Sequence, residues 1–280
     1  MNYAVTGIDT FLGFDLNGSR RFVIFDIRYN KLQTIMPRLK ILFRAGRKEV
    51  TIGTVPRVVG TISSLTRAFP SARQKVLCDV VEVRLDKMER PPDWLARCQA
   101  IQDHGWPVLL TLRLKNEGGE WKGLDAKRWD LFEEGIRGLA GVDIEWRSKI
   151  VFPVAIFAKR KRKICVISYH DFEKTPPAAK LEEIVAEAQE LASIVKIATQ
   201  LNNAEDEENL RTLLTRKWKR PLCVIGMGPA WTHTRVLFPQ LGSCLAYGYL
   251  DKPSAPGQLS AAALSRQLGE PKPPVAATEM

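Results

Sequence analysis

Two apolar segments of the sequence each hold one residue that can act on a carbonyl compound. Lys196 lies in the middle of residues 194–198, where its charge resists burial, and His170 ends the preceding apolar run. Burial beside arginine side chains would lower the pKa of a lysine, and a neutral amine can form a Schiff base with a ketone. A histidine at the end of a strand either caps it or serves as a general acid and base, and we favour the second role. The other histidines, His104 and His233, are expected on the surface.

Charged side chains occupy every second position of residues 80–86. Glu82, Arg84 and Asp86 alternate with apolar residues, so in a strand they point to one face. Buried charges are costly unless they are paired or used in function. This strand therefore predicts either an internal Glu–Arg pair or part of a site.

Asp143 and Glu145 share a face in the same way in residues 142–145. We expect Asp143 to pair with Arg84 or Arg113, although these carboxylates could also tune a neighbouring lysine.

Two arginines, one at the end of an expected strand and one after another strand, suit an anionic substrate. Arg113 ends residues 108–113, and a glycine-containing loop comes after it. Arg235 lies near an expected helix start and could hold a carboxylate through two hydrogen bonds.

Short apolar runs alternate with amphipathic segments from residue 58 to residue 268. The expected strands are residues 58–62, 80–84, 108–113, 142–145, 164–169, 194–198, 222–226 and 245–247. The expected helices are residues 130–139, 178–192, 206–214 and 260–268, with Thr175 as the N-cap of the second. Eight strand–helix units predict an α/β fold, a (β/α)₈ barrel of the TIM type. A doubly wound open sheet is the second possibility, but no GxGxxG pattern follows the first strand. In a barrel, chemistry belongs at the C-terminal ends of the strands, where the residues above lie.

The chain of 280 residues is expected to have three parts. Residues 1–50 form a basic N-terminal extension that is partly irregular and poorly defined, and we expect it to be dispensable for chemistry. Residues 51–268 form the catalytic (β/α)₈ domain, and residues 269–280 form a disordered tail.

Composition excludes several classes of protein. No apolar run approaches the roughly 18 to 20 residues that a membrane span needs, and no signal-peptide pattern is visible, so we expect a cytoplasmic protein without membrane association. Five cysteines without a C-x-x-C pair predict free thiols and no metal site. The net charge is +11, but the basic residues form no single stripe, so we expect an anionic substrate and no nucleic acid.

Six segments, in this order, resemble type I 3-dehydroquinate dehydratase. They are residues 82–86 (Glu-Val-Arg-Leu-Asp), 143–145 (Asp-Ile-Glu), 167–176 (Ile-Ser-Tyr-His-Asp-Phe-Glu-Lys-Thr-Pro), 195–198 (Val-Lys-Ile-Ala), 227–235 (Met-Gly, ending in Arg) and 254–258 (Ser-Ala-Pro-Gly-Gln). The Ser-Tyr-His-Asp-Phe and Ser-Ala-Pro-Gly-Gln motifs are specific when found together. The resemblance covers residues 58–268 and leaves the first fifty outside.

The resemblance implies a dehydration of 3-dehydroquinate to 3-dehydroshikimate, in the shikimate pathway, without metal or cofactor. Lys196 would form an imine with the substrate ketone. His170 would take the proton from the neighbouring carbon and return one to the departing hydroxyl. Glu117 would orient His170.

The resemblance also implies which groups bind the substrate, and that the protein is a homodimer. Arg235 would bind the carboxylate, and Ser254 and Gln258 would close over it. Glu82, Arg84 and Arg113 would hold the ring hydroxyls.

Three residues depart from the family pattern. Trp231 replaces a glycine, Thr234 a serine and Ala246 a threonine. A bulky ring in a loop that should approach the substrate predicts that Trp231 packs over this loop as part of a lid.

Two other functions stay open. Another Schiff-base barrel lyase or aldolase, acting on a sugar phosphate, would need a glycine-rich anion nest where Pro229 and Trp231 lie. A non-catalytic basic protein that binds nucleic acid is less favoured, because it leaves Lys196 and His170 unexplained.

Overall fold

The computed structural model describes residues 9–14, 20–25, 41–45, 48–65, 78–253, 255 and 257–269. The chain divides into two compact units, Met1–Met36 and Pro37–Met280. In the first unit, β1 (Asp9–Phe14) and β2 (Arg20–Phe25) form an antiparallel hairpin. All other described elements belong to the second unit.

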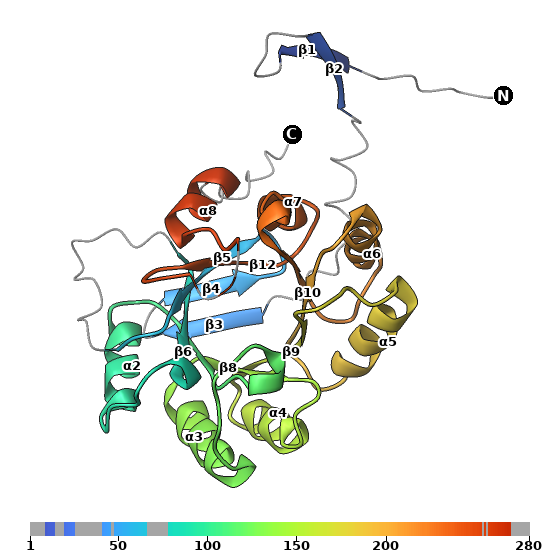
Figure 1. The fold of residues 1–280 in the computed structure, drawn as a ribbon. Coiled ribbons are helices and arrows are strands. Elements are labelled where there is room, and N and C mark those ends of the chain that lie inside the picture. The colour runs from blue at the N-terminus through green and yellow to red at the C-terminus, as the bar shows by residue number, and fades with distance from the viewer. Residues whose placement is uncertain are drawn as a thin grey trace, which may run out of the picture. The chain divides into compact units, whose positions relative to one another are not determined.

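Eight parallel strands form the sheet at the centre of the second unit (Figure 1). They are β5 (Arg57–Ile62), β6 (Val80–Arg84), β7 (Val108–Thr111), β8 (Gly141–Glu145), β9 (Ile164–Asp171), β10 (Ile194–Gln200), β11 (Leu222–Met227) and β12 (Leu245–Tyr249). The sheet runs from β11 through β10 to β5 and then to β12. Each strand therefore pairs with the next one along the chain, as in a (β/α)₈ barrel, and the predicted fold is confirmed.

The two end strands, β11 and β12, meet at a seam. The N–H of Cys244 donates to the carbonyl of Leu222 at 2.9 Å. The side chain of Ser243 completes the contact, because its hydroxyl accepts from the N–H of Val224 at 2.9 Å. The Ser243 side chain thus helps to join β11 to β12, which have no continuous ladder of backbone hydrogen bonds between them.

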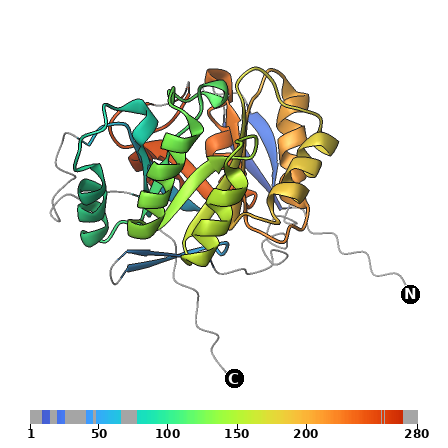
Figure 2. The ribbon, with the colours of Figure 1, turned by 90° about the horizontal axis from the view of Figure 1, so that it is seen from below.

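Helices surround the strands (Figure 1). They are α2 (Trp94–Asp103), α3 (Asp125–Gly138), α4 (Val151–Arg160), α5 (Ala178–Ala188), α6 (Ala204–Thr215), α7 (Thr234–Gln240) and α8 (Ala261–Leu268). Figure 2 shows the green helices α3 and α4 packed across the strands behind them. Local signals set some of the ends: Asn203 and Ser260 accept N-cap hydrogen bonds in α6 and α8.

Alternation along the strands separates two apolar cores. Residues such as Val81, Val83 and Ile197 point outward and pack with the inner faces of the helices. Residues of the opposite parity, such as Leu109 and Ile194, fill the barrel interior toward the N-terminal ends of the strands. The polar residues of the same parity lie nearer the C-terminal ends, so the fold itself gathers them in one place.

A second hairpin packs against residues of the barrel interior. It consists of β3 (Ile41–Ala45) and β4 (Lys48–Ile52), which pair antiparallel. Phe43 and Ile52 are fully buried and cluster with interior residues of the barrel such as Leu109. The boundary expected between residues 50 and 51 thus falls inside β4, and residues of the expected extension belong to the core.

One predicted helix start is wrong. Helix α5 begins at Ala178 with Pro177 at its N-cap position, not Thr175. The Thr175 hydroxyl instead lies 2.8 Å from that of Thr199 and donates to the carbonyl of Gln200 at 2.7 Å. Thr175 therefore ties the loop after β9 to the end of β10.

Candidate active site

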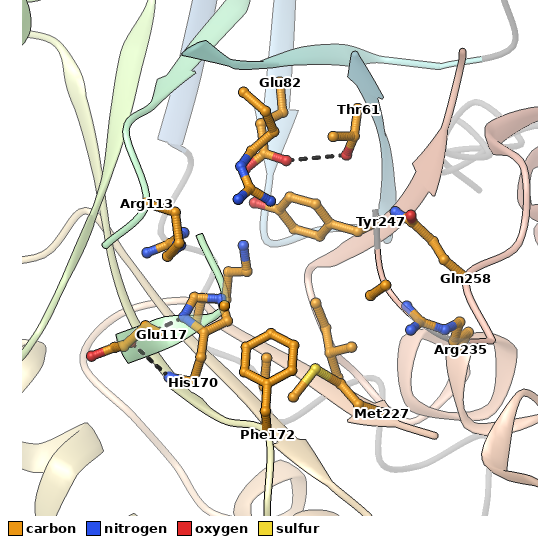
Figure 3. Close-up of a pocket in the computed structure, with 16 residues that line it drawn as sticks. Thr61, Glu82, Arg113, Glu117, His170, Phe172, Met227, Arg235, Tyr247 and Gln258 are labelled. Atoms are coloured by element: carbon orange, nitrogen blue, oxygen red, sulfur yellow. Dashed lines mark hydrogen bonds and ion pairs between the residues drawn. The ribbon is translucent and has the colours of Figure 1, made fainter. Parts of the chain in front are cut away.

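A pocket opens at the C-terminal ends of the strands (Figure 3). It encloses about 530 Å³, part of which is open to solvent. The residues that line it are Thr61, Glu82, Arg84, Arg113, Glu117, Gly118, His170, Phe172, Lys196, Ala198, Ile225, Met227, Arg235, Tyr247, Ala255 and Gln258. Eight of the nine residues expected in the site therefore line one pocket, and the ninth, Ser254, lies outside the described residues.

Lys196 lies in the interior of the barrel on β10 and is only 5% exposed. Its Nζ is 3.0 Å from Oδ2 of Asp143 on β8. The same Nζ lies over the aromatic ring of Tyr247, 4.0 Å from the ring centroid. A carboxylate and an aromatic face thus hold this amine in a site that excludes most water.

Asp143 connects the lysine to Arg113. Its Oδ1 accepts from Arg113 at 2.7 Å and from the Ser168 hydroxyl at 2.6 Å. Burial alone would raise the pKa of Asp143, but Arg113 and Lys196 together hold it below its ordinary value. Asp143 is therefore a buried anion, paired with Arg113 as expected and also with the lysine.

A second buried carboxylate fixes Arg113 from the other side. Glu145 lies 3.3 Å from Arg113 and also pairs with Arg128 of α3. Its Oε1 accepts from the N–H of Leu114 at 2.8 Å. Several groups satisfy each charge, so the guanidinium of Arg113 has little freedom to move.

His170 ends its strand in contact with Glu117, which belongs to the short helix η2 (Lys115–Glu117) after β7. Oε2 of Glu117 accepts from the backbone N–H of His170 at 3.0 Å and lies 3.2 Å from its Nδ1. Burial lowers the pKa of His170 well below its ordinary value, and the nearby charges of Arg113 and Lys196 add to this effect. His170 is thus a neutral imidazole at physiological pH, able to accept a proton.

Arg147 holds this pair from outside the barrel. Its Nε donates to Oε1 of Glu117 at 2.9 Å, and a terminal nitrogen donates to the carbonyl of His170 at 2.6 Å. The guanidinium also lies over the ring of Tyr169, 4.7 Å from its centroid. Burial raises the pKa of Glu117, whereas the hydrogen bond from Arg147 acts in the opposite direction.

Glu82 and Arg84, the two charged residues of β6, have different hydrogen-bond partners. Glu82 accepts from Thr61 at 3.0 Å and from Thr111 at 2.8 Å. Arg84 makes two hydrogen bonds to Asp86, at 3.0 and 2.8 Å. The expected internal Glu–Arg pair in this strand is therefore an Arg–Asp pair.

Arg235 lies at the start of α7 and is buried. Burial lowers its pKa to about 10, so it stays cationic at neutral pH. Gln258 lines the same part of the pocket, as Figure 3 shows.

The three departures from the family pattern leave the pocket lining intact. The side chain of Trp231 lies against Gly228 and near the ring of His233, and Trp231 is not among the lining residues. Thr234 donates from its buried hydroxyl to the carbonyl of Trp231 at 2.8 Å. Ala246 packs outward against α8.

Sequence reasoning missed Arg147 and Tyr247. Arg147 follows β8 in a segment with no periodic pattern, and only the folded chain brings it to Glu117. Tyr247 shares its parity on β12 with Leu245, so alternation could have placed it in the interior. The two other histidines are exposed, as expected, and His233 contacts Glu207 at 3.1 Å.

Two further observations concern the described residues only. Among them, no group of three or more His, Cys, Asp or Glu side chains is arranged to hold a metal ion. Within the same part of the chain, no helix is both long and apolar enough to cross a membrane.

Comparison with known proteins agrees with this geometry. Residues 55–271 match the model of the type I 3-dehydroquinase family. A 3-dehydroquinate dehydratase of Methanocella arvoryzae is 35% identical over 205 residues, which cover 73% of this chain and 91% of that protein. A second one, of Methanocaldococcus jannaschii, is 36% identical over 205 residues, 70% of this chain and 89% of the relative.

Solved structures give the same result. The type I 3-dehydroquinate dehydratase of Clostridium difficile superimposes with a TM-score of 0.71 at 26% identity, covering 82% of this chain and 96% of that one. The 3-dehydroquinate dehydratase of Enterococcus faecalis gives a TM-score of 0.67 at 29% identity, covering 78% of this chain and 95% of that one. The chain therefore belongs to the type I 3-dehydroquinase family, hydro-lyases of the shikimate pathway.

Proposed function

We propose that this chain dehydrates 3-dehydroquinate through a Schiff base on Lys196. The observation that supports it best is the buried Nζ of Lys196, held 3.0 Å from Asp143 in a pocket that three arginines also line. His170 takes a proton from the ammonium of Lys196, and the neutral amine then attacks the ketone carbon of the substrate. The carbinolamine oxygen leaves as water after taking one proton from the amine and one from His170, which gives a protonated imine. Asp143 stabilises the positive charge on this nitrogen in the imine as it does in the ammonium.

His170 carries the proton in the next step. The imine withdraws electrons from the adjacent carbon, and the neutral imidazole of His170 takes a proton there. The electron pair of that C–H bond forms the new double bond, and the hydroxyl on the following carbon leaves with a proton from His170. Water then hydrolyses the imine and releases Lys196, so the overall change is the loss of one water.

Glu117 supports His170 in both directions of this transfer. A carboxylate beside Nδ1 favours the tautomer with its proton on that atom and leaves Nε2 as the base. The same carboxylate stabilises the imidazolium while His170 holds the substrate proton. Arg147 in turn fixes Glu117.

The rest of the pocket fits the substrate chemically. Arg235 supplies a buried cation for the carboxylate, with Gln258 beside it and Ser254 in the same loop. Glu82, Arg84 and Arg113 provide donors and acceptors for the ring hydroxyls.

Trapping with borohydride tests this proposal. Reduction in the presence of 3-dehydroquinate should leave a covalent mass increase on Lys196, and Lys196→Ala should abolish both the adduct and the rise of enone absorbance in the ultraviolet. His170→Ala should still form the adduct, while turnover falls by about 10²–10⁴-fold.

Lys163 provides a matched control, because it is a partly buried lysine before β9 that does not line the pocket. Lys163→Ala should label and turn over as the unchanged protein does. An adduct on another lysine, or normal turnover by Lys196→Ala, would overturn the mechanism.

A further inference from the structure

Tyr247 crosses the pocket from β12. Its side chain faces the barrel interior and is 6% exposed. In Figure 3 the ring lies in the middle of the pocket, and its hydroxyl end points toward the side of Glu82 and Arg113, away from Arg235 and Gln258. The hydroxyl is thus on the side where the substrate ring would lie.

The ring face of Tyr247 covers the amine of Lys196. The 4.0 Å distance from Nζ to the ring centroid places the nitrogen directly against the aromatic surface. A substrate carbon bonded to this nitrogen would therefore also lie close to the ring. An oxygen on the same carbon can reach the hydroxyl that this ring carries.

The hydroxyl of Tyr247 is buried and has no hydrogen-bond partner among the residues that the structure describes. The nearby carboxylate of Glu82 already accepts hydrogen bonds from Thr61 and Thr111. Burying such a group without a partner costs free energy, and it is usually paired in native structures. A ligand oxygen in the pocket would supply the missing acceptor.

The hydroxyl keeps its proton under working conditions. Burial raises the pKa of Tyr247 well above its ordinary value, and the nearby carboxylates of Glu82 and Asp143 act in the same direction. Tyr247 is therefore a hydrogen-bond donor and not a source of protons.

We propose that Tyr247 is a catalytic residue whose hydroxyl donates a hydrogen bond to the carbonyl oxygen of the substrate while Lys196 attacks the carbonyl carbon. Negative charge develops on this oxygen as the C–N bond forms, and a donor already in place stabilises it. The hydroxyl then holds the oxygen of the carbinolamine until a proton carried by His170 allows it to leave as water. This inference rests on the Schiff base proposed above and adds a residue to its first step.

Tyr247→Phe tests the inference, because it removes one oxygen and keeps the ring over Lys196. We expect kcat/KM to fall about tenfold or more, and the rate of borohydride trapping on Lys196 to fall with it. Imine formation would then limit turnover, so any isotope effect from deuterium on the carbon next to the ketone should shrink. The free variant should unfold at the same or a higher urea concentration, since a buried hydroxyl without a partner is gone.

Tyr249→Phe is the matched control. Tyr249 lies on the same strand, but it is half-buried and does not line the pocket, so kcat/KM should not change. Unchanged kcat/KM in Tyr247→Phe, or a lower kcat/KM with an unchanged trapping rate, would overturn the role of Tyr247 and leave the Schiff base intact. Failure of the unchanged protein to form an adduct on Lys196 would instead overturn the proposed function.

Discussion

Arg147 and His170 are joined through the two oxygens of one carboxylate. Glu117 receives the guanidinium of Arg147 on Oε1 and the N–H and ring of His170 on Oε2. The charged and titratable groups around this carboxylate are Arg113, Glu145, Arg147 and His170. A half-exposed arginine outside the barrel therefore acts on a buried imidazole inside it.

Arg147→Gln should move the acid limb of the pH–rate profile to higher pH. Burial raises the pKa of Glu117 and Arg147 opposes it, so without Arg147 this pKa should rise further. Activity that needs the carboxylate would then be lost at a higher pH. The profile of kcat/KM against pH checks this.

Arg137→Gln serves as the control, because Arg137 pairs with Glu133 on the exposed side of α3. A lower plateau in Arg147→Gln without movement of the limb would mean that Arg147 only supports the fold.

Asp143→Asn should cost about 3–5 kcal/mol of unfolding free energy, because it leaves Arg113 and Lys196 buried without their shared anion. Urea denaturation measures this loss. Asp130→Asn, at an exposed position of α3, should stay within about 0.5 kcal/mol of the unchanged protein. A loss below about 1 kcal/mol for Asp143→Asn would show that the pairs add little to stability.

His170 should make stability depend on pH. Its pKa in the folded protein lies well below the ordinary value, whereas in the unfolded chain it lies near 6.5. The unfolded state therefore binds more protons in this interval, so the contribution of His170 is fully present above about pH 6.5 and is lost as pH falls toward the folded pKa.

Comparison with His170→Gln isolates this effect from that of Glu117, whose raised pKa acts in the opposite direction. The difference in unfolding free energy between the two proteins should increase from pH 5 to pH 7, by at most about 1.4 kcal/mol per pH unit. Parallel curves would contradict the prediction.

Two N-terminal deletions should differ. Removal of residues 1–36 leaves the second unit whole, and we expect no effect on kcat/KM. Removal of residues 1–47 also takes β3 and its buried Phe43, which should cost at least about 3 kcal/mol of unfolding free energy. Thermal unfolding and turnover of both proteins decide the matter; equal stability of the two would show that the hairpin is not part of the core.

The sequence was most informative where a charged residue lies inside an otherwise apolar strand. Lys196 and Glu82 could be placed in the interior because a strand has a period of two, and their charge marks them there. Phe43 escaped notice because its hairpin is short and lies in a strongly basic segment. Arg147 could not be found, since its contact with Glu117 joins the turn after β8 to the short helix η2, and no local pattern encodes their spacing. Thr175 was wrongly predicted as an N-cap because its hydroxyl forms hydrogen bonds with the end of β10 and not with the first turn of α5.

The seam between β11 and β12 also has a consequence for motion. Few hydrogen bonds cross it, and one of them depends on the Ser243 hydroxyl, so local opening should cost less there than at any continuous ladder. Arg235 follows one of these strands, and Gln258 follows the other. The two groups expected at the substrate carboxylate can therefore separate and return without breaking strand pairing, and amide hydrogen exchange should be fastest along this line of the barrel.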